Sequence, residues 1–559
     1  MRVIKIWNII LVILFVLLFV SIYNVRSNRK SYNDYLINKE INFKDESMES
    51  KTFIDSLNYT PSSIIPFWFW NGNMTKKEIK NQIKLIKDVG INELMIHARS
   101  GLEQEYLSEE WFELVGFALE ELKKNNMKVW IYDEFDWPSG TAGGKVLEKK
   151  PHLIAKNLKM EKVNKSYFSL KTNEKFNVKK IVSVIIYEKD SKKNVKNDYC
   201  IENSCFFEDL YLNNSIYVFY QDFGHFRTEY KQNYYVDLLD SETTKTFIKL
   251  THEEYYKRFS DYFQDTIVGF FTDEPGFYSN VYEEYDIGSI PWTDDFENDF
   301  YEIKGYNITD YIYFIWEEGN SNISRKIRKD YFEVRNTIYS KNYFEIIRNW
   351  TREHNILFSG HVLIEEDLSQ IVLFQGDFFT PIKYFDIPGT DDINKFDEGK
   401  ITPILVSSAE FIYGKPYSLT ETFAGYGWDL SYNEVLKTSE WLYENGVDII
   451  VVHAFFYTTE GDIQYNDYPP SFFYQNKIIW DYMSDYINYT SERFYLENQQ
   501  KEIVFIKYPI SEAWEVFNPY NFSYIEKLDY EMKQAIAYYK EEGKDIILVP
   551  DYILKQIKI

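Results

Sequence analysis

The chain has 559 residues, more than one small core needs, so we expect a barrel-sized domain with smaller attachments. It carries 62 basic and 87 acidic residues, a net charge of −25, and this sign disfavours nucleic acid as a partner because phosphates would be repelled. Aromatic residues make up 19% of the sequence. Aromatic rings can stack on the C–H faces of sugars, so the excess is compatible with a carbohydrate ligand. Part of the excess can also come from AT-rich codon bias, which raises the number of tyrosines.

The N-terminus has the pattern of a targeting segment. Arg2 and Lys5 precede an almost entirely apolar run at 6–23, which as a helix would be about 27 Å long, roughly one hydrocarbon core. No small-residue cleavage site follows the run, so it predicts an uncleaved signal anchor over 1–30 that exports the rest of the chain to the cell surface. A cleaved signal peptide and a secreted protein is the alternative.

From residue 61 to about 500, after a polar linker at 31–60, apolar runs alternate with amphipathic helices, which is the pattern of an α/β fold with a (β/α)8 TIM-type barrel. Eight strands are predicted at 64–70, 91–98, 128–133, 267–272, 356–362, 385–388 (or 404–407), 417–420 and 447–453. The main helices are predicted at 76–89, 109–125, 251–264, 325–354 and 432–445.

Two segments depart from this pattern. Alternating sequences at 180–188, 215–221 and 234–239 predict a β-rich subdomain inserted at about 153–250, after the third strand. Beyond the barrel, a strand at 502–508, a helix at 527–541 and a strand at 545–549 predict a truncated α/β module over 501–559.

The chain has two cysteines, Cys200 and Cys205. Their spacing allows a local disulfide in an oxidising compartment, and two free thiols are the equal alternative. They do not resemble a metal site.

Polar and aromatic residues cluster where the predicted strands end. Because barrel enzymes carry their chemistry at the C-terminal ends of the strands, these residues are candidates for a functional site. They are Trp68, Trp70, Asn71, His97, Arg99, Asp133, Glu134, Asp136, Trp137, Asp273, Glu274, His361, Glu365, Glu366, Glu421, His453 and Tyr457. Three of the seven histidines of the chain are among them, which favours a functional rim over isolated structural histidines.

Glu274 and Glu421 are the strongest candidates, because they follow the fourth and seventh strands and so face each other across a barrel mouth. One carboxyl kept protonated and one kept ionised suffice to cleave a glycosidic bond. The neighbouring Asp273 would raise a carboxyl pKa. Taken alone, Glu274 could equally cap a turn, and the acidic cluster around Asp133 could bind calcium.

Several stretches together resemble the catalytic barrel of glycoside hydrolase family 106, whose members are α-L-rhamnosidases. They are 66–72, 96–102, 106–112, 130–140, 269–276, 359–363, 387–393, 420–428 and 452–457. The resemblance implies inverting hydrolysis with Glu274 as the general acid and Glu421 as the general base. Some members of the family bind calcium beside the sugar, so the resemblance makes a calcium ion possible here. The sequence alone does not identify which residues would bind a metal. Members of the family commonly carry β-sandwich domains after the barrel, and we do not expect such a domain to form before Ile559.

We therefore expect an extracellular glycoside hydrolase that acts on an oligosaccharide or polysaccharide. His97, Arg99, His361 and His453 would bind hydroxyls, and Trp68, Trp70 and Trp137 would stack on the sugar. A non-catalytic carbohydrate-binding barrel and a retaining hydrolase of the β-galactosidase or β-glucuronidase type are the alternatives. In retaining enzymes the two carboxyls lie about 5 Å apart, against roughly 6.5–9.5 Å in inverting ones.

Overall fold

The structure is a computed structural model that describes residues 35–37, 47–171, 176, 178–188, 191–208, 214–228, 233–278, 288–393, 395–397, 399–495 and 502–556. The predicted anchor at 1–30 lies outside this part of the chain. Among the residues that are described, no helix is both long enough and apolar enough to cross a membrane.

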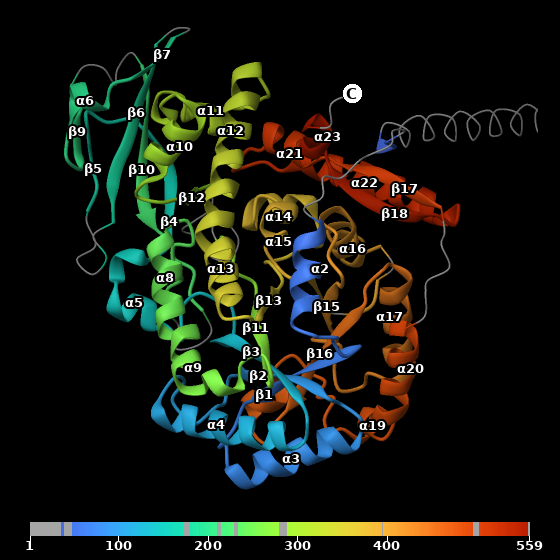
Figure 1. Cartoon of the computed structure of the whole chain (residues 1–559). Helices are drawn as coiled ribbons and strands as arrows, with labels where there is room; N and C mark the ends of the chain where they lie inside the picture. Colours follow the sequence, from blue (N-terminus) through green and yellow to red (C-terminus); the bar gives the residue numbers. More distant parts are fainter. Residues whose placement is uncertain are drawn as a thin grey trace, which may run out of the picture.

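Eight parallel strands close into a barrel in the order β1-β16-β15-β14-β13-β11-β3-β2, which confirms the predicted fold class (Figure 1). The strands are β1 (Ile64–Trp70), β2 (Glu93–Ala98), β3 (Lys128–Phe135), β11 (Ile267–Thr272), β13 (Leu357–Gly360), β14 (Ile387–Asp392), β15 (Leu419–Thr422) and β16 (Ile449–Phe456). Their side chains are buried almost without exception, as expected of strands covered by helices.

The sixth strand lies at β14, so the alternative at 404–407 is wrong. Those residues belong to helix α16 (Thr402–Tyr413). Pro403 stands in its first turn, where a missing N–H costs nothing, and Gly414 ends it with a φ of 52°.

Helices surround the barrel. Those at predicted places include α3 (Lys76–Asp88), α4 (Glu109–Lys124), α9 (His252–Phe259) and α17 (Tyr432–Glu444), whereas α8 (Ser241–Leu250) and α20 (Met483–Tyr495) were not predicted. Their starts are fixed by side chains that satisfy free backbone N–H groups, such as Thr75 before α3 and the capping box of Ser431 and Glu434 at α17. The predicted helix at 325–354 runs as α12 (Asn322–Tyr339), a π-helical turn at Ser340–Glu345 and α13 (Ile346–Glu353).

The insertion forms two antiparallel sheets beside the barrel (Figure 1). The first has the order β12-β4-β10-β6-β7, and the second has the order β5-β9-β8. Their strands are β4 (Lys156–Val163), β5 (Tyr167–Ser169), β6 (Lys180–Glu188), β7 (Ser191–Asn194), β8 (Cys200–Ile201), β9 (Ser204–Phe206), β10 (Ser215–Phe223) and β12 (Ile290–Trp292).

Two details differ from the sequence-based expectation. The edge strand β12 comes from beyond residue 250, because it follows barrel strand β11. The predicted strand at 234–239 is absent: Tyr234 and Val236 make isolated bridges only. Of the two alternatives for the cysteines, the structure has the disulfide between Cys200 and Cys205, which joins β8 to β9.

The C-terminal segment folds as predicted, with strand β17 (Ile503–Tyr508) parallel to β18 (Asp545–Pro550) and helix α22 (Ser523–Glu541) between them. Helices α21 (Ile510–Val516) and α23 (Asp551–Gln556) complete it. Leu36 forms an antiparallel bridge with Ile506, so the chain ahead of the barrel reaches this module. In Figure 1 the module lies beside α14 (Leu368–Phe374), α15 (Phe379–Ile382) and α16.

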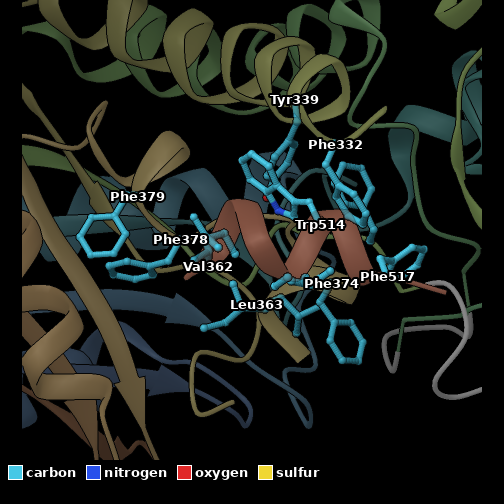
Figure 2. Close-up of a cluster of buried hydrophobic side chains, with 14 of the residues drawn as sticks. Phe332, Tyr339, Val362, Leu363, Phe374, Phe378, Phe379, Trp514 and Phe517 are labelled. Carbon is cyan, nitrogen blue, oxygen red and sulfur yellow. The ribbon is translucent and has the colours of Figure 1, made fainter. Parts of the chain in front are cut away.

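Figure 2 shows how the module joins the barrel. Trp514 of α21 is 3% exposed and lies within a cluster that includes Phe332, Phe374 and Leu363. Its ring is parallel to that of Phe332 at 6.0 Å, and its Nε1 donates a hydrogen bond to the Gly376 carbonyl at 2.6 Å. The module therefore shares one core with the segment 361–376 that follows β13.

Replacing Trp514 should test this shared core. We expect Trp514→Ala to lower the free energy of unfolding by about 3–5 kcal/mol, because it leaves a large cavity and an unpaired carbonyl. The measurement is urea denaturation, with Tyr530→Ala as the control, since Tyr530 is 64% exposed. A loss below about 1 kcal/mol would mean that the barrel does not depend on the module.

Candidate active site

A cavity of about 470 Å³ opens at the C-terminal ends of the barrel strands, a size typical of small-molecule sites. Its walls combine carboxylates with apolar and aromatic side chains. They are Arg99, Trp137, Asp273, Glu274, Leu363, Ile364, Glu366, Asp367, Gln370, Asp391, Ile393, Glu421, Ala424, His453 and Tyr468. The two glutamates singled out from the sequence thus line one cavity.

His361 lies behind the cavity and joins two of its carboxylates. The Nε2 atom is 3.0 Å from Glu421 Oε2 and 3.2 Å from Asp273 Oδ1. On the other side of the ring, Nδ1 lies 3.4 Å from the Val362 carbonyl. Because both nitrogens face oxygen acceptors, the ring is best satisfied as an imidazolium.

The charge of the surroundings agrees with that protonation state. Burial alone would lower the pKa of His361, but the negative charges of Asp273 and Asp391 outweigh it and raise the pKa. A protonated His361 neutralises part of the negative charge that Asp273 and Glu421 bring into the site.

Asp273 is held by three groups. Tyr132 Oη donates to its Oδ2 at 2.5 Å, and Ser139 Oγ accepts from its backbone N–H at 2.9 Å. His361 contacts the other carboxylate oxygen. These bonds fix the end of β11 and therefore fix the starting point of Glu274.

Glu274 has the backbone φ of 48° that places a non-glycine residue in the left-handed region, a conformation that often marks functional sites. Burial raises the pKa of its carboxyl to about 8, the negative charge of Asp273 adds to the rise, and His361 opposes it. Glu274 is therefore largely protonated near neutral pH.

Glu421 has a different environment. Burial and the charge of Asp273 raise its pKa, while the positive charge of Arg99 opposes that rise. It also faces the imidazole of His361 at hydrogen-bonding distance. The net effect is a pKa well above the usual range of a glutamate, so the contact with His361, together with the charge of Arg99, is what favours an ionised Glu421.

Asp391 is the main residue that sequence reasoning missed. It lies in β14, opposite Glu421 in the register of the two strands, and it lines the cavity. The signal was the pair Asp391–Asp392 at the end of an apolar run, but the predicted strand ended at 388, so these residues were not read as strand-end groups. Tyr468 and Asp367 come from loops and Gln370 comes from helix α14 (Leu368–Phe374), and none of them gave such a signal.

Several predicted site residues do not line the cavity. Trp68 and Trp70 are fully buried, and Trp68 Nε1 donates to Gln82 of α3 at 2.8 Å, so both rings face the helical layer. The Asn71 side chain makes hydrogen bonds with the backbone C=O and N–H of Thr458. The Tyr457 hydroxyl donates a hydrogen bond to the Asn73 carbonyl and accepts one from the Thr75 N–H.

Further predicted residues do not line the cavity either. His97 is fully buried, with its ring stacked on Tyr132 at 3.4 Å. Asp133 accepts from Ser139 Oγ at 2.6 Å, and Glu134 accepts from the backbone N–H groups of the turn at 141–143. Asp136 accepts from Ser100 and lies 3.5 Å from Arg99 Nε.

Among the described residues, one group of side chains brings possible cation ligands together: Asp273, His361 and Glu421 present ligand atoms within 4.8 Å of one another. Calcium prefers oxygen ligands and the imidazole already bridges both carboxylates, so this group fits calcium poorly. Nearby, Glu365 Oε2 and Asp391 Oδ1 are buried without a hydrogen-bond partner.

A closed parallel barrel whose mouth carries acidic pairs is the architecture of a barrel glycosidase. The family model of glycoside hydrolase family 106, described as alpha-L-rhamnosidase, matches residues 233–521. The chain belongs to this family. No curated protein matches the sequence.

Solved structures with the same fold include a rhamnosidase from Novosphingobium sp. PP1Y, with a TM-score of 0.57 and 12% identity over 82% of this chain. The chain spans 62% of that protein's length. A β-galactosidase from the psychrophilic Marinomonas ef1 has a TM-score of 0.52 and 9% identity, over 87% of this chain and 70% of its own. At such identities the likeness concerns the fold alone.

Proposed function

We propose that the protein hydrolyses α-L-rhamnosides, with Glu274 as the general acid and Glu421 as the general base. The observation that carries the proposal is the unequal setting of the two carboxyls in one cavity. Burial raises the pKa of both carboxyls, to about 8 for Glu274 and well above the usual range for Glu421, but of the two only Glu421 lies at hydrogen-bonding distance, 3.0 Å, from the His361 imidazole. A cationic neighbour at that distance favours the ionised form that a general base needs.

In this mechanism the Glu274 carboxyl gives its proton to the glycosidic oxygen as the C–O bond breaks. Glu421 removes a proton from the water that attacks the anomeric carbon, so the sugar leaves with inverted configuration. The two glutamates then exchange their protonation states through solvent, which restores the starting enzyme. His361 stabilises the ionised carboxylate of Glu421 until it accepts the proton from the attacking water.

The rest of the cavity would hold the sugar. Arg99 and His453 offer polar contacts, and Trp137 offers an aromatic face. Leu363, Ile364 and Ile393 offer an apolar surface, which suits the methyl group of a 6-deoxy sugar better than a hydroxymethyl group that would lose its hydrogen bonds.

A screen of aryl glycosides tests the substrate. We expect the aryl α-L-rhamnoside to be cleaved with a higher kcat/KM than the β-D-galactoside or the β-D-glucuronide, and NMR to detect the inverted sugar first. Preferred cleavage of a β-galactoside with retention would favour the alternative hydrolase. Sugar binding without any cleavage would favour a non-catalytic barrel.

We also propose that the active domain is extracellular. The apolar segment at 6–23 is the export signal, and the Cys200–Cys205 disulfide suits an oxidising compartment. Protease accessibility of the barrel on intact cells would test the location.

The pH dependence follows from the acid. Because Glu274 must carry a proton to act, kcat/KM should fall as the pH rises through about 8, where its carboxyl ionises. In Asp273→Asn the negative neighbour is lost, so this alkaline limb should move to lower pH. If kcat/KM of the wild-type protein stayed constant up to pH 10, this would contradict the role of Glu274 as the general acid.

A further inference from the structure

The loop that follows β16 is tied to the loop that follows β15. The N–H of Gly427 donates to the Pro469 carbonyl at 2.9 Å, and that of Gly425 donates to the Tyr468 carbonyl at 3.4 Å. Trp428 Nε1 donates to the Tyr465 carbonyl at 3.1 Å, and the two rings stack at 4.7 Å. The loop thereby brings Tyr468 to the cavity wall.

Asp467 of this loop reaches across the barrel mouth to Arg99, which follows β2. The contact is bidentate: Arg99 Nε lies 2.8 Å from Oδ2, and Nη2 lies 2.8 Å from Oδ1. The side chains are 4% and 8% exposed. Two parallel charge-assisted hydrogen bonds in a dry setting fix both the position and the orientation of a guanidinium.

Other contacts restrict Arg99 further. Its guanidinium carbon lies 4.5 Å from the Phe69 ring centre and 4.6 Å from that of Trp137. Asp136 Oδ1 lies 3.5 Å from Nε. Burial alone would lower the pKa of Arg99, but the charges of Asp467 and Asp136 outweigh it and raise the pKa. The guanidinium is thus always charged and held between two rings.

One edge of this guanidinium is left for a ligand. Within the described part of the chain, Nε and Nη2 have carboxylate partners whereas Nη1 makes no hydrogen bond, and Arg99 lines the cavity. Because two carboxylates already balance its charge, such a group suits a neutral hydroxyl as well as an ion. A sugar hydroxyl is a fitting acceptor.

We propose that Asp467 is a positioning residue, which aims the free edge of Arg99 at a hydroxyl of the bound sugar and latches the loop after β16 as a wall of the cavity. The first half of this inference rests on the proposed glycosidase function, because it takes the ligand to be a sugar. The second half, the latch, does not depend on which ligand binds.

Kinetics of Asp467→Ala and Asp467→Asn test the aiming role. We expect KM for the aryl α-L-rhamnoside to rise by about tenfold or more in Asp467→Ala, with kcat changed by less than about threefold, because ground and transition states lose the same contact. Asp467→Asn keeps one acceptor oxygen, so its KM should lie between those of the wild type and Asp467→Ala. The matched control is Asp462→Asn, an exposed acid of the same loop, which should leave both constants unchanged.

A double-mutant cycle with Arg99→Ala sharpens the result. If Asp467 acts through Arg99, the double variant should be no worse than Arg99→Ala alone, whereas independent effects would multiply. An unchanged KM in Asp467→Ala would overturn the aiming role. A loss confined to kcat together with a lower melting temperature would overturn it as well, since it would indicate a merely structural residue.

Amide hydrogen exchange tests the latch without any substrate. The N–H groups of Gly425 and Gly427 and the loop at 457–470 should exchange faster in Asp467→Ala than in Asp462→Asn. Unchanged exchange would overturn the latch. A wild-type protein that cleaves no glycoside but still shows this difference would refute the proposed function and leave the latch standing.

Discussion

Glu274→Gln is expected to lower kcat on an aryl α-L-rhamnoside with a poor leaving group by about 10²–10⁴-fold, the usual contribution of a general acid. Glutamine keeps the size of the side chain but has no proton to give to the glycosidic oxygen. Folding should be unaffected, because the side chain lines the cavity and the amide is neutral, like the protonated carboxyl that it replaces.

The leaving group provides the control for this prediction. A dinitrophenyl leaving group departs without protonation, so the loss in Glu274→Gln should shrink to a small factor on that substrate. The alkaline limb of the pH profile should also disappear, since the group that ionises near pH 8 is gone. An equal loss on both substrates would assign Glu274 to another role.

The strands of the barrel were predictable because each is a short apolar run bounded by polar residues. Ile64–Trp70 and Ile267–Thr272 match the prediction at both ends. The sixth strand was harder, since β14 reads Ile-Pro-Gly-Thr-Asp-Asp and carries little apolar signal. Its apolar residues come before Asp391, which lines the cavity, so Asp391 was missed.

The direction of side chains within a strand was not predictable from the strand's end alone. Trp68 and Trp70 occupy alternate positions of β1 and face the helices, whereas Phe67 and Phe69 face the barrel interior. Side chains alternate along a strand, so a shift of one residue decides between cavity and helical layer. Proximity to a strand's C-terminal end therefore identifies candidates but does not distinguish the two faces.

Contacts between segments that are distant in the sequence could not be predicted either. Asp467 and Arg99 are separated by 368 positions, and Trp514 meets Gly376 across 138. The C-terminal module further reaches the cavity wall through Lys533, which pairs with Asp367 and lies 2.9 Å from Asp529. These pairings depend on how the loops after β13 and β16 fold back, for which single-sequence periodicity carries no information.

Glu421→Gln is expected to lower kcat to a similar or greater extent, about 10²–10⁴-fold, because glutamine cannot accept the proton of the attacking water. Unlike the loss in Glu274→Gln, this loss should be the same for good and poor leaving groups, since water must be activated in either case. The amide oxygen can still accept from His361 Nε2, which lies 3.0 Å from the present carboxylate, so the fold should be preserved.

His361 offers an independent check on the base. In the wild-type protein burial lowers the pKa of His361, and the charges of Asp273, Asp391 and Glu274 outweigh it and raise the pKa, so Glu421→Gln should leave the pKa of His361 raised, as NMR of the histidine ring can measure. A loss in Glu421→Gln that shrank with a good leaving group would make Glu421 the acid and Glu274 the base. The pair of substrates thus decides between the two assignments, because only the acid's contribution depends on the leaving group.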